Sequence, residues 1–490
     1  MSHYDSEKLA IDQAEKRHSV NGGLQAGKDN NYAVEIAPAG QSQHVQDAVF
    51  GDMGDDGPNY RAVGPLGAFA LMTKANIGLG VLSIPFVFME VGMVPGVILL
   101  LVINLIIMYC ACIIGDFKMN HPEVYAIADA GFVVGGRFGR EYFGLAFVLF
   151  MIFVSASGIL AIATALNAVS STATHHGACT AIFIAVAAVC GFLLAQVRTL
   201  GKISWIGWIG LVSIMAAILT LTIAVGVQER PYLASKEYPT GPWPKNLKVT
   251  NNPPFSNAMS AINSIIFAFA ATPTYFGIIS EMRDPRSYKR TMCISMGLLY
   301  CVYATIGIVV YYFCGQYVAN PALGSAGPTM KKVAYGIAIP ALLATVCIYL
   351  HLAAKYFFVR ILSGTPHLAS STKIHWITWY SCVIGSALIA YIIGSAIPIF
   401  GNLISLVGAL IGPSVCIAPY AWMWYHDNWK LNLTGRRNVF MLAVNGFLFA
   451  LAIFFTAAGT YGAIVAIIDD PNRSKPWGCA DNSNTVEIKQ

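Results

Sequence analysis

The chain has 490 residues, of which 56% are apolar and only 11% are charged, whereas soluble globular proteins carry charge on about a quarter of their residues. Long stretches contain no Asp, Glu, Lys or Arg at all, among them residues 144–195, 203–227 and 374–425. This composition excludes a soluble enzyme, a nucleic-acid-binding protein and a small secreted domain held by disulfides. It predicts an all-α, polytopic membrane protein.

The N-terminal segment, residues 1–60, is polar and acidic, with ten acidic and four basic residues. It lacks periodic apolar residues, so we predict a disordered cytosolic tail. It also lacks the apolar core of a cleavable signal peptide, which means that the first hydrophobic span itself must direct insertion.

Eleven apolar segments follow, and each is read as a membrane-spanning helix, because a helix needs about 20 residues to cross the hydrocarbon. A loop at 228–255 carries six prolines and is predicted to be ordered but irregular. The predicted spans are residues 66–90, 92–115, 143–171, 178–196, 203–227, 256–280, 291–314, 333–361, 376–396, 399–424 and 439–467.

The distribution of basic residues predicts the orientation. With the N-terminus inside, the inside loops hold fifteen Lys and Arg residues, and the outside loops together with the C-terminal segment hold nine. Because inside loops are enriched in Lys and Arg, we predict a cytosolic N-terminus and an extracellular tail at 469–490. The plasma membrane is the expected location, with the vacuolar membrane as the alternative.

The first and sixth spans carry matching interruptions. Residues 76–85 read Asn-Ile-Gly-Leu-Gly-Val-Leu-Ser-Ile-Pro, and Pro273 lies among small residues in the middle of the sixth span. Either interruption alone also fits a kinked helix in which glycine allows close packing. Paired interruptions five spans apart are typical of a transporter with an inverted repeat. We therefore predict repeats at 61–227 and 256–424, followed by an added span within 425–468.

Two motifs resemble a known family. The segment 76–85 resembles the first-helix signature of the amino acid/auxin permease family, and Gly-Ile-Ile-Ser-Glu-Met-Arg-Asp-Pro at 277–285 is similar to the end of its sixth helix. The closest resemblance is to the neutral and aromatic amino acid permeases of filamentous fungi. This resemblance implies a LeuT-like fold of five plus five inverted helices and one more, and secondary active uptake of neutral amino acids with protons.

An amino acid zwitterion needs donors for its carboxylate and acceptors for its ammonium, and broken helices offer both without side-chain charge. Free N–H groups at the break in the first span would bind the carboxylate, and free carbonyls of the first and sixth spans would bind the ammonium. Two phenylalanines of the sixth span lie where related folds place an aromatic lid, although core packing explains them equally well. The predicted substrate-binding residues are Asn76, Ile77, Gly78, Leu79, Gly80, Ser157, Ile266, Phe267, Ala268 and Phe269.

Ionisable residues inside membrane spans are candidates for ion coupling, because they are rare and costly there. Sodium-coupled members of the LeuT-like group place two hydroxyl residues together on the eighth span, where this chain has Thr345 without such a pair. We therefore predict proton coupling through Lys74, His351 and Glu281. The ammonium of Lys74 would take the place of a sodium ion, and His351 could titrate near neutral pH. Alternatively, Lys74 extends to the cytosolic surface, and Glu281 caps its helix or pairs with Arg283.

Nine of the eleven cysteines lie in or at the ends of apolar spans and are predicted to pack as small apolar residues. Cys179 and Cys479 alone could meet an oxidising solution, and their positions provide little reason to pair them. No Cys/His spacing indicates a metal site, no cofactor is expected, and no phosphate-binding loop indicates an ATP-driven pump.

Three other functions remain open at this point. The chain could be an amino acid sensor that keeps the fold and signals through residues 1–60, which offer little structure for that role. It could also transport another small zwitterion. A membrane acyltransferase using His351 would need a second His or Asp cluster at the membrane face, which we do not find, so no enzyme is predicted.

Overall fold

The computed structural model describes residues 46–47, 51–52, 63–170, 178–196, 200–362, 365, 367, 372–429, 435–469, 475–479 and 482–483, with the backbone alone at 46–47, 51–52 and 200–204. Helices dominate the described residues. Strands β1 (Gln46–Asp47) and β2 (Gly51–Asp52) form a short antiparallel pair. The remainder of 1–60 lies outside the described residues, so its disorder stays a prediction.

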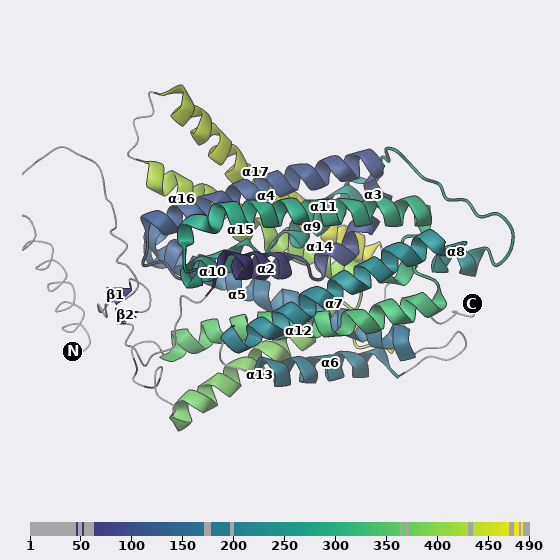
Figure 1. Ribbon diagram of the computed structural model, residues 1–490, viewed down its shortest axis with the longest axis horizontal. Coiled ribbons are helices and arrows are strands. Elements are labelled where there is room, and N and C mark those ends of the chain that lie inside the picture. The colour runs from purple at the N-terminus through teal and green to yellow at the C-terminus, as the bar shows by residue number, and fades with distance from the viewer. Residues whose placement is uncertain are drawn as a thin grey trace, which may run out of the picture.

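The long helices run roughly along the longest axis of the molecule (Figure 1). Helix α5 contains both the loop that precedes the third predicted span and the span itself. A kink separates these two parts at Gly136, which has φ +57°, a conformation that favours glycine. In chain order, the first half forms α2 (Pro65–Asn76), η1 (Gly80–Ser83), α3 (Ile84–Val91), α4 (Met93–Asn120), α5 (Ile127–Ser170), α6 (Thr180–Ala195), α7 (Leu200–Val227) and α8 (Tyr232–Glu237).

The second half of the chain repeats this pattern of long apolar helices and short connections. Helix α12 contains Pro340 and remains one helix through it. In order, the elements are α9 (Phe255–Ala268), η2 (Thr272–Thr274), α10 (Tyr275–Glu281), η3 (Pro285–Ser287), α11 (Tyr288–Cys314), η4 (Gly315–Tyr317), η5 (Ala322–Ser325), α12 (Pro328–Leu362), α13 (Lys373–Ala396), α14 (Phe400–Leu410), α15 (Gly412–Cys416), α16 (Ala418–Asn428) and α17 (Arg436–Ile468).

Helices stop at both interruptions that the sequence predicts. In the first span, α2 ends at Asn76 and the chain resumes after a bend of 43° as η1 and α3, with Pro85 in the first turn of α3. In the sixth span, α9 ends at Ala268, and Pro273 lies in η2 before α10. Proline lacks a backbone donor and fits a first turn, which explains where each helix restarts.

The tenth span is also broken, whereas its sequence at 399–424 predicts one continuous helix. Helices α14 and α15–α16 meet at an angle of 49°. Gly412 and Pro413 begin α15 directly after the break, so a Gly-Pro pair in an apolar segment was the available signal.

The predicted count of eleven spans is not confirmed. Among the described residues, eight helices are long and apolar enough to cross a membrane, or up to ten if each of two bent pairs is one span. Helix α6 has only 16 residues, and at 1.5 Å per residue it falls short of the roughly 30 Å of hydrocarbon. The chain is therefore a multi-pass membrane protein by its helices, with eight to ten candidate spans.

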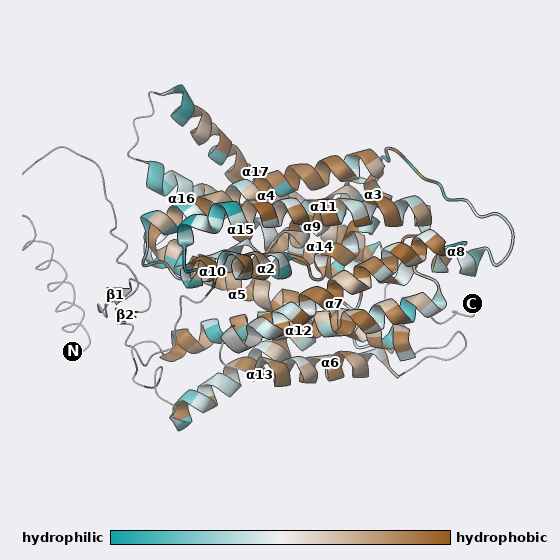
Figure 2. Cartoon of the chain, in the orientation of Figure 1, coloured by the Kyte–Doolittle hydropathy of each residue, from teal (hydrophilic) through white to brown (hydrophobic). Residues whose placement is uncertain are grey.

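Apolar residues cover the lengths of the helices, and hydrophilic residues gather toward their ends (Figure 2). Large apolar side chains face outward on several helices, such as Leu101 and Leu105 on α4 and Val212 and Ile223 on α7. An outer surface of this kind suits lipid rather than water. Inside, α12 packs against α5, α7 and α13, and α9 packs against α14 and α17.

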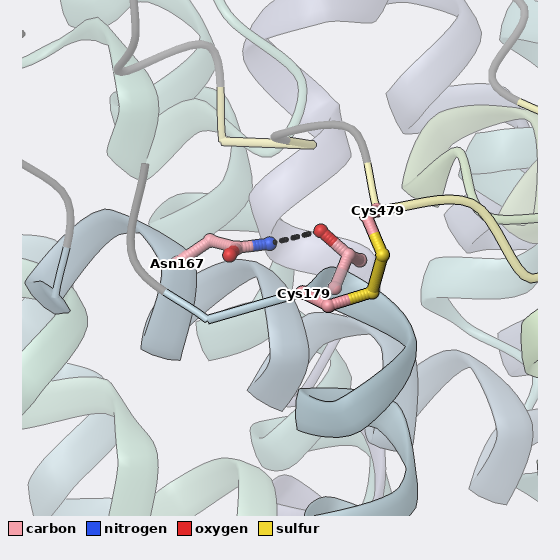
Figure 3. Close-up of a disulfide and its surroundings, with 4 residues drawn as sticks. Asn167, Cys179 and Cys479 are labelled. Atoms are coloured by element: carbon pink, nitrogen blue, oxygen red, sulfur yellow. Dashed lines mark hydrogen bonds between the residues drawn. A yellow bond between two sulfur atoms is a disulfide. The ribbon is translucent and has the colours of Figure 1, made fainter. Parts of the chain in front are cut away.

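Cys179 and Cys479 form a disulfide, although their positions in the sequence provide little reason to pair them. It joins the start of α6 to the C-terminal segment across 300 residues (Figure 3). The side-chain amide of Asn167 donates to the side chain of Asn482 at 2.8 Å, and Lys331 donates to the carbonyl of Ser483. We call the end of the bundle with this bond the disulfide end.

The two ends of the bundle are distinct. The amine of Lys331 also lies over the ring of Tyr232 in α8, which places α8 at the disulfide end. Helices α10 and α16 lie toward the opposite end of the bundle (Figure 1).

Candidate functional site

The breaks of the first and sixth spans lie against each other. A Cβ added to Gly80 would lie 2.4 Å from the Cα of Ala268, a backbone atom that cannot move aside easily. Gly80 begins η1, and Ala268 is the last residue of α9. The backbones at the two breaks therefore touch at this point, and only glycine fits there.

Tyrosines from two other helices bind carbonyls that the breaks leave without helical partners. The hydroxyl of Tyr303 in α11 lies 2.9 Å from the carbonyl of Asn76 and 3.1 Å from that of Ala268, so its one hydrogen is shared between the two helix ends. The hydroxyl of Tyr349 in α12 donates to the carbonyl of Ala75 at 2.9 Å. Buried carbonyls need such partners, so the two tyrosines stabilise the broken geometry.

The Lys74 side chain turns into the protein instead of reaching a surface, and the residue is 5% exposed. Its ammonium donates to the hydroxyl of Thr345 at 3.1 Å and lies 3.4 Å from the carbonyl of Ile77. Both oxygens are formally neutral. The hydroxyl of Thr345 in turn donates to the carbonyl of Ala341, so the ammonium joins the break in the first span to α12.

A small cavity lies beside these groups. It has a volume of about 20 Å³, which is close to the space of one water molecule. A molecule larger than water therefore needs movement of the walls to enter. The lining residues are Lys74, Ala75, Asn76, Gly78, Leu79, Gly80, Phe150, Val154, Phe267, Ala270, Ala271, Thr345 and Tyr349.

The structure brings together most of the predicted substrate residues of the first span and Phe267 of the sixth. The ring of Phe267 lies 6.5 Å from that of Phe150 in α5, on the cavity wall. Phe269 instead is fully buried, with its ring 5.1 Å from the ring of Tyr303. The two predicted lid residues thus have different surroundings.

The other predicted substrate residues lie near the breaks or on α5 but do not line the cavity. Ile77, Ile266 and Ala268 are buried at the helix ends. The hydroxyl of Ser157 donates to the carbonyl of Phe153 one turn earlier in α5.

The three predicted ion-coupling residues lie in three different places. Lys74 lines the cavity, whereas the buried ring of His351 lies 5.3 Å from the ring of Trp379 in α13. Glu281 ends α10, where it interacts electrostatically with Lys355 and accepts a 3.4 Å hydrogen bond from the hydroxyl of Tyr125. They form no single cluster among the described residues.

A backbone contact also holds Glu281. Its carbonyl accepts from the N–H of Val63, and the N–H of Arg283 donates to the carbonyl of Val63. The chain just before α2 is therefore attached to the end of α10.

Sequence reasoning missed several residues at the site, among them Tyr303, Tyr349, Phe150 and Val154. A usable signal existed for the tyrosines, because a phenol in the middle of an apolar span must find a hydrogen-bond partner. Phe150 and Val154 carry no such signal, since nothing in an apolar span marks which face meets a cavity.

The chain matches the family model described as transmembrane amino acid transporter protein over residues 62–465. It is 32% identical to a protein of Gibberella moniliformis named transmembrane transporter, covering 88% of this chain and 90% of that protein. It is 34% identical to the N amino acid transport system protein of Neurospora crassa, covering 82% of this chain and 85% of the relative.

Family and relatives are transporters and not enzymes. The match includes both the segment 76–85 and the segment 277–285 that carry the motifs. The chain therefore belongs to the transmembrane amino acid transporter family, the amino acid/auxin permease family that those motifs resemble.

Proposed function

We propose that this protein is a secondary active transporter that carries neutral amino acids together with protons. The observation that carries the proposal is the position of Lys74, whose ammonium lies between the carbonyl of Ile77 and the hydroxyl of Thr345 beside the cavity. A LeuT-like inverted repeat of eleven spans is part of the proposal, and it is supported by the paired breaks of the first and sixth spans.

Neutral substrates suit the residues around the cavity. The described residues that line it include apolar side chains such as Leu79, Phe150, Val154 and Phe267, one amine and no carboxylate. An uncompensated amine repels cationic substrates, and the apolar wall accommodates aliphatic and aromatic side chains. The broken backbone at 77–79 and 269–271 supplies donors and acceptors for the zwitterion.

Proton coupling would use the amine of Lys74. A buried positive charge that meets only neutral oxygens is costly to hold. Opening the cavity to water on one side would change that cost, so that the amine could take up a proton there and release it on the other. In its protonated form, the ammonium fills the place that a bound cation would take between the first span and α12.

The proposed orientation places the disulfide end outside the cytosol. Disulfides persist in oxidising compartments, and Cys179 and Cys479 lie at that end. Basic residues of the loops gather at the opposite end, among them Arg283, Arg286 and Lys289, which favours a cytosolic position for it. We propose the plasma membrane, with the vacuolar membrane as the alternative.

The test is uptake of a labelled neutral amino acid into liposomes that contain the purified protein. An imposed inside-alkaline pH gradient should drive accumulation, and a proton ionophore should abolish it. A sodium gradient without a pH gradient should drive none. A competition panel of neutral, acidic and basic amino acids then reads the substrate class.

Variants at Lys74 sharpen the test. Lys74→Met should abolish gradient-driven accumulation while substrate binding persists, and Lys373→Met, at the exposed start of α13, is the matched control that should behave as wild type. Accumulation by Lys74→Met that still follows the pH gradient would contradict the role of Lys74. Binding without accumulation in the wild-type protein would favour the sensor.

A further inference from the structure

Three polar side chains that lie far apart in the sequence meet at the end of the bundle opposite the disulfide. His121 follows the last turn of α4, and His426 and Asp427 lie in the last turn of α16. One carboxylate oxygen, Oδ1 of Asp427, lies 2.8 Å from Nε2 of His121 and 3.2 Å from Nδ1 of His426. The three donor atoms all lie within 4.8 Å of one another.

These distances fit the coordination shell of a small transition-metal ion. Nitrogen and oxygen atoms that each lie about 2.0 Å from zinc are about 3.3 Å apart in a tetrahedral shell. If the three ligand atoms moved apart by a few tenths of an ångström, the ion would fit at the centre of the group. Two imidazoles and one carboxylate form a common set of three protein ligands for zinc, with a fourth position left to water.

Neighbouring groups orient the side chains, as they do around bound metals. The amide of Asn120 donates to the other oxygen of Asp427 at 2.9 Å, which leaves Oδ1 directed at the two rings. The carboxylate of Glu123 lies 3.7 Å from Nδ1 of His121, so Nε2 is the nitrogen turned to the group. The ring of Phe117 lies 4.4 Å from the ring of His121 and supports it from one side.

The group is accessible without being fully exposed. The side chain of Asp427 is 12% exposed, that of His121 21% and that of His426 37%. Beside it lies a cavity of about 450 Å³, lined by Val134, Trp422, Tyr425, His426, Asp427 and Trp429. An ion and its water ligand can enter from this side.

From this geometry we propose that His121, His426 and Asp427 bind a divalent transition-metal ion, for which Zn²⁺ is the best fit. The ligands come from two spans that are separated by 306 residues between His121 and Asp427. A bound ion would fix the end of α4 to the end of α16. The sequence contains no spacing that would indicate this site, because folding alone brings the ligands together.

The test uses the full-length protein, purified and stripped of metal, and measures binding of Zn²⁺ at buffered free concentrations by calorimetry. One ion should bind per chain, and bound Co²⁺ should show the strong visible absorption of a tetrahedral site. His121→Ala and Asp427→Asn should each weaken Zn²⁺ binding by roughly tenfold or more, as loss of a ligand or of its orientation does. The matched control His367→Ala, which removes an imidazole from the connection between α12 and α13, should leave binding unchanged.

A second readout guards against variants that fail to fold. Zn²⁺ should raise the apparent melting temperature of the wild-type protein and of His367→Ala, but not that of Asp427→Asn. No stoichiometric binding to the wild-type protein, or equal binding in all variants, would overturn the proposal and leave a hydrogen-bonded His–Asp–His group. Neither measurement depends on transport, so this site and the proposed function can fail separately.

Discussion

Gly80 is the residue on which the contact between the two helix breaks depends. Even a methyl group there would lie 2.4 Å from the Cα of Ala268 and 2.7 Å from its Cβ. A Cβ on Gly78 would meet only the side chain of Thr345, at ordinary distances of 3.6 Å from its hydroxyl oxygen and 3.9 Å from its methyl carbon. Both glycines line the cavity, but they have different tolerances, since a Cβ on Gly80 would meet backbone and a Cβ on Gly78 would meet only a side chain.

We predict that Gly80→Ala abolishes uptake and destabilises the protein by about 1–3 kcal/mol, because overpacking must separate the first and sixth spans. Gly277→Ala is the control, since a Cβ there meets nothing within 4 Å. Uptake and the apparent melting temperature in detergent are the measurements. Normal transport by Gly80→Ala would show that the two breaks do not stay in contact.

Removal of the Tyr303 hydroxyl is a second single change with a large expected effect on stability and uptake. Tyr303→Phe keeps the ring but leaves the carbonyls of Asn76 and Ala268 without this donor. An unsatisfied buried polar group costs about 1–3 kcal/mol, so stability and uptake should both fall. Tyr300→Phe, on the same helix, should stay close to wild type. Equal melting temperatures for the two variants would contradict this account.

At the scale of elements, the end of α9 places the two phenylalanines of the sixth span in different surroundings. Phe267 lies in the last turn of α9 on the cavity wall, and Phe269 lies in the break, packed against Tyr303. The two phenylalanines are only two residues apart, but helical geometry ends at Ala268 between them, so their rings lie in different surroundings.

Phe267→Ala should therefore weaken binding of large apolar amino acids by about 1–3 kcal/mol and change binding of small ones less. Phe269→Ala should instead lower stability by about 3–5 kcal/mol, because it leaves a hole in a packed core. Competition assays with a large and a small neutral amino acid, beside melting curves, distinguish the two effects. If both variants behave in the same way, Phe267 is a core residue and covers no substrate.

At the scale of the whole molecule, the C-terminal segment is attached to the bundle at several points. Besides the disulfide and the contacts of Asn482 and Ser483, the N–H of Trp477 donates to the carbonyl of Ser395 at the end of α13. The segment thus joins α5, α6, α12 and α13 at the disulfide end. These contacts limit how far the four helices can separate at the disulfide end.

Cys479→Ser should free the thiol of Cys179 and expose it to a membrane-impermeant maleimide added outside intact cells. The double variant Cys179→Ser/Cys479→Ser is the control for labelling of the remaining cysteines. Wild-type protein should label at Cys179 only after reduction. Labelling of Cys179 from the cytosolic side alone would reverse the proposed orientation.

The sequence by itself determined the class of the protein, the place of most helices and the two paired breaks, because apolar length and the backbone limits of Gly and Pro are local properties. It did not determine the break at Ile411, although Gly412 and Pro413 follow directly, nor the number of spans. Both depend on how an apolar segment is cut into helices.

Only the tertiary structure decided which groups meet. Lys74 and Thr345 are 271 residues apart, Tyr303 and Asn76 are 227 apart, and the disulfide cysteines are 300 apart. Almost every span is apolar along its length, so hydrophobicity cannot tell a face that meets lipid from one that meets a cavity. The partners of buried polar groups depend on how the helices pack, and the resulting contacts place the cavity, the position of Lys74 and the His–Asp–His group in the folded chain.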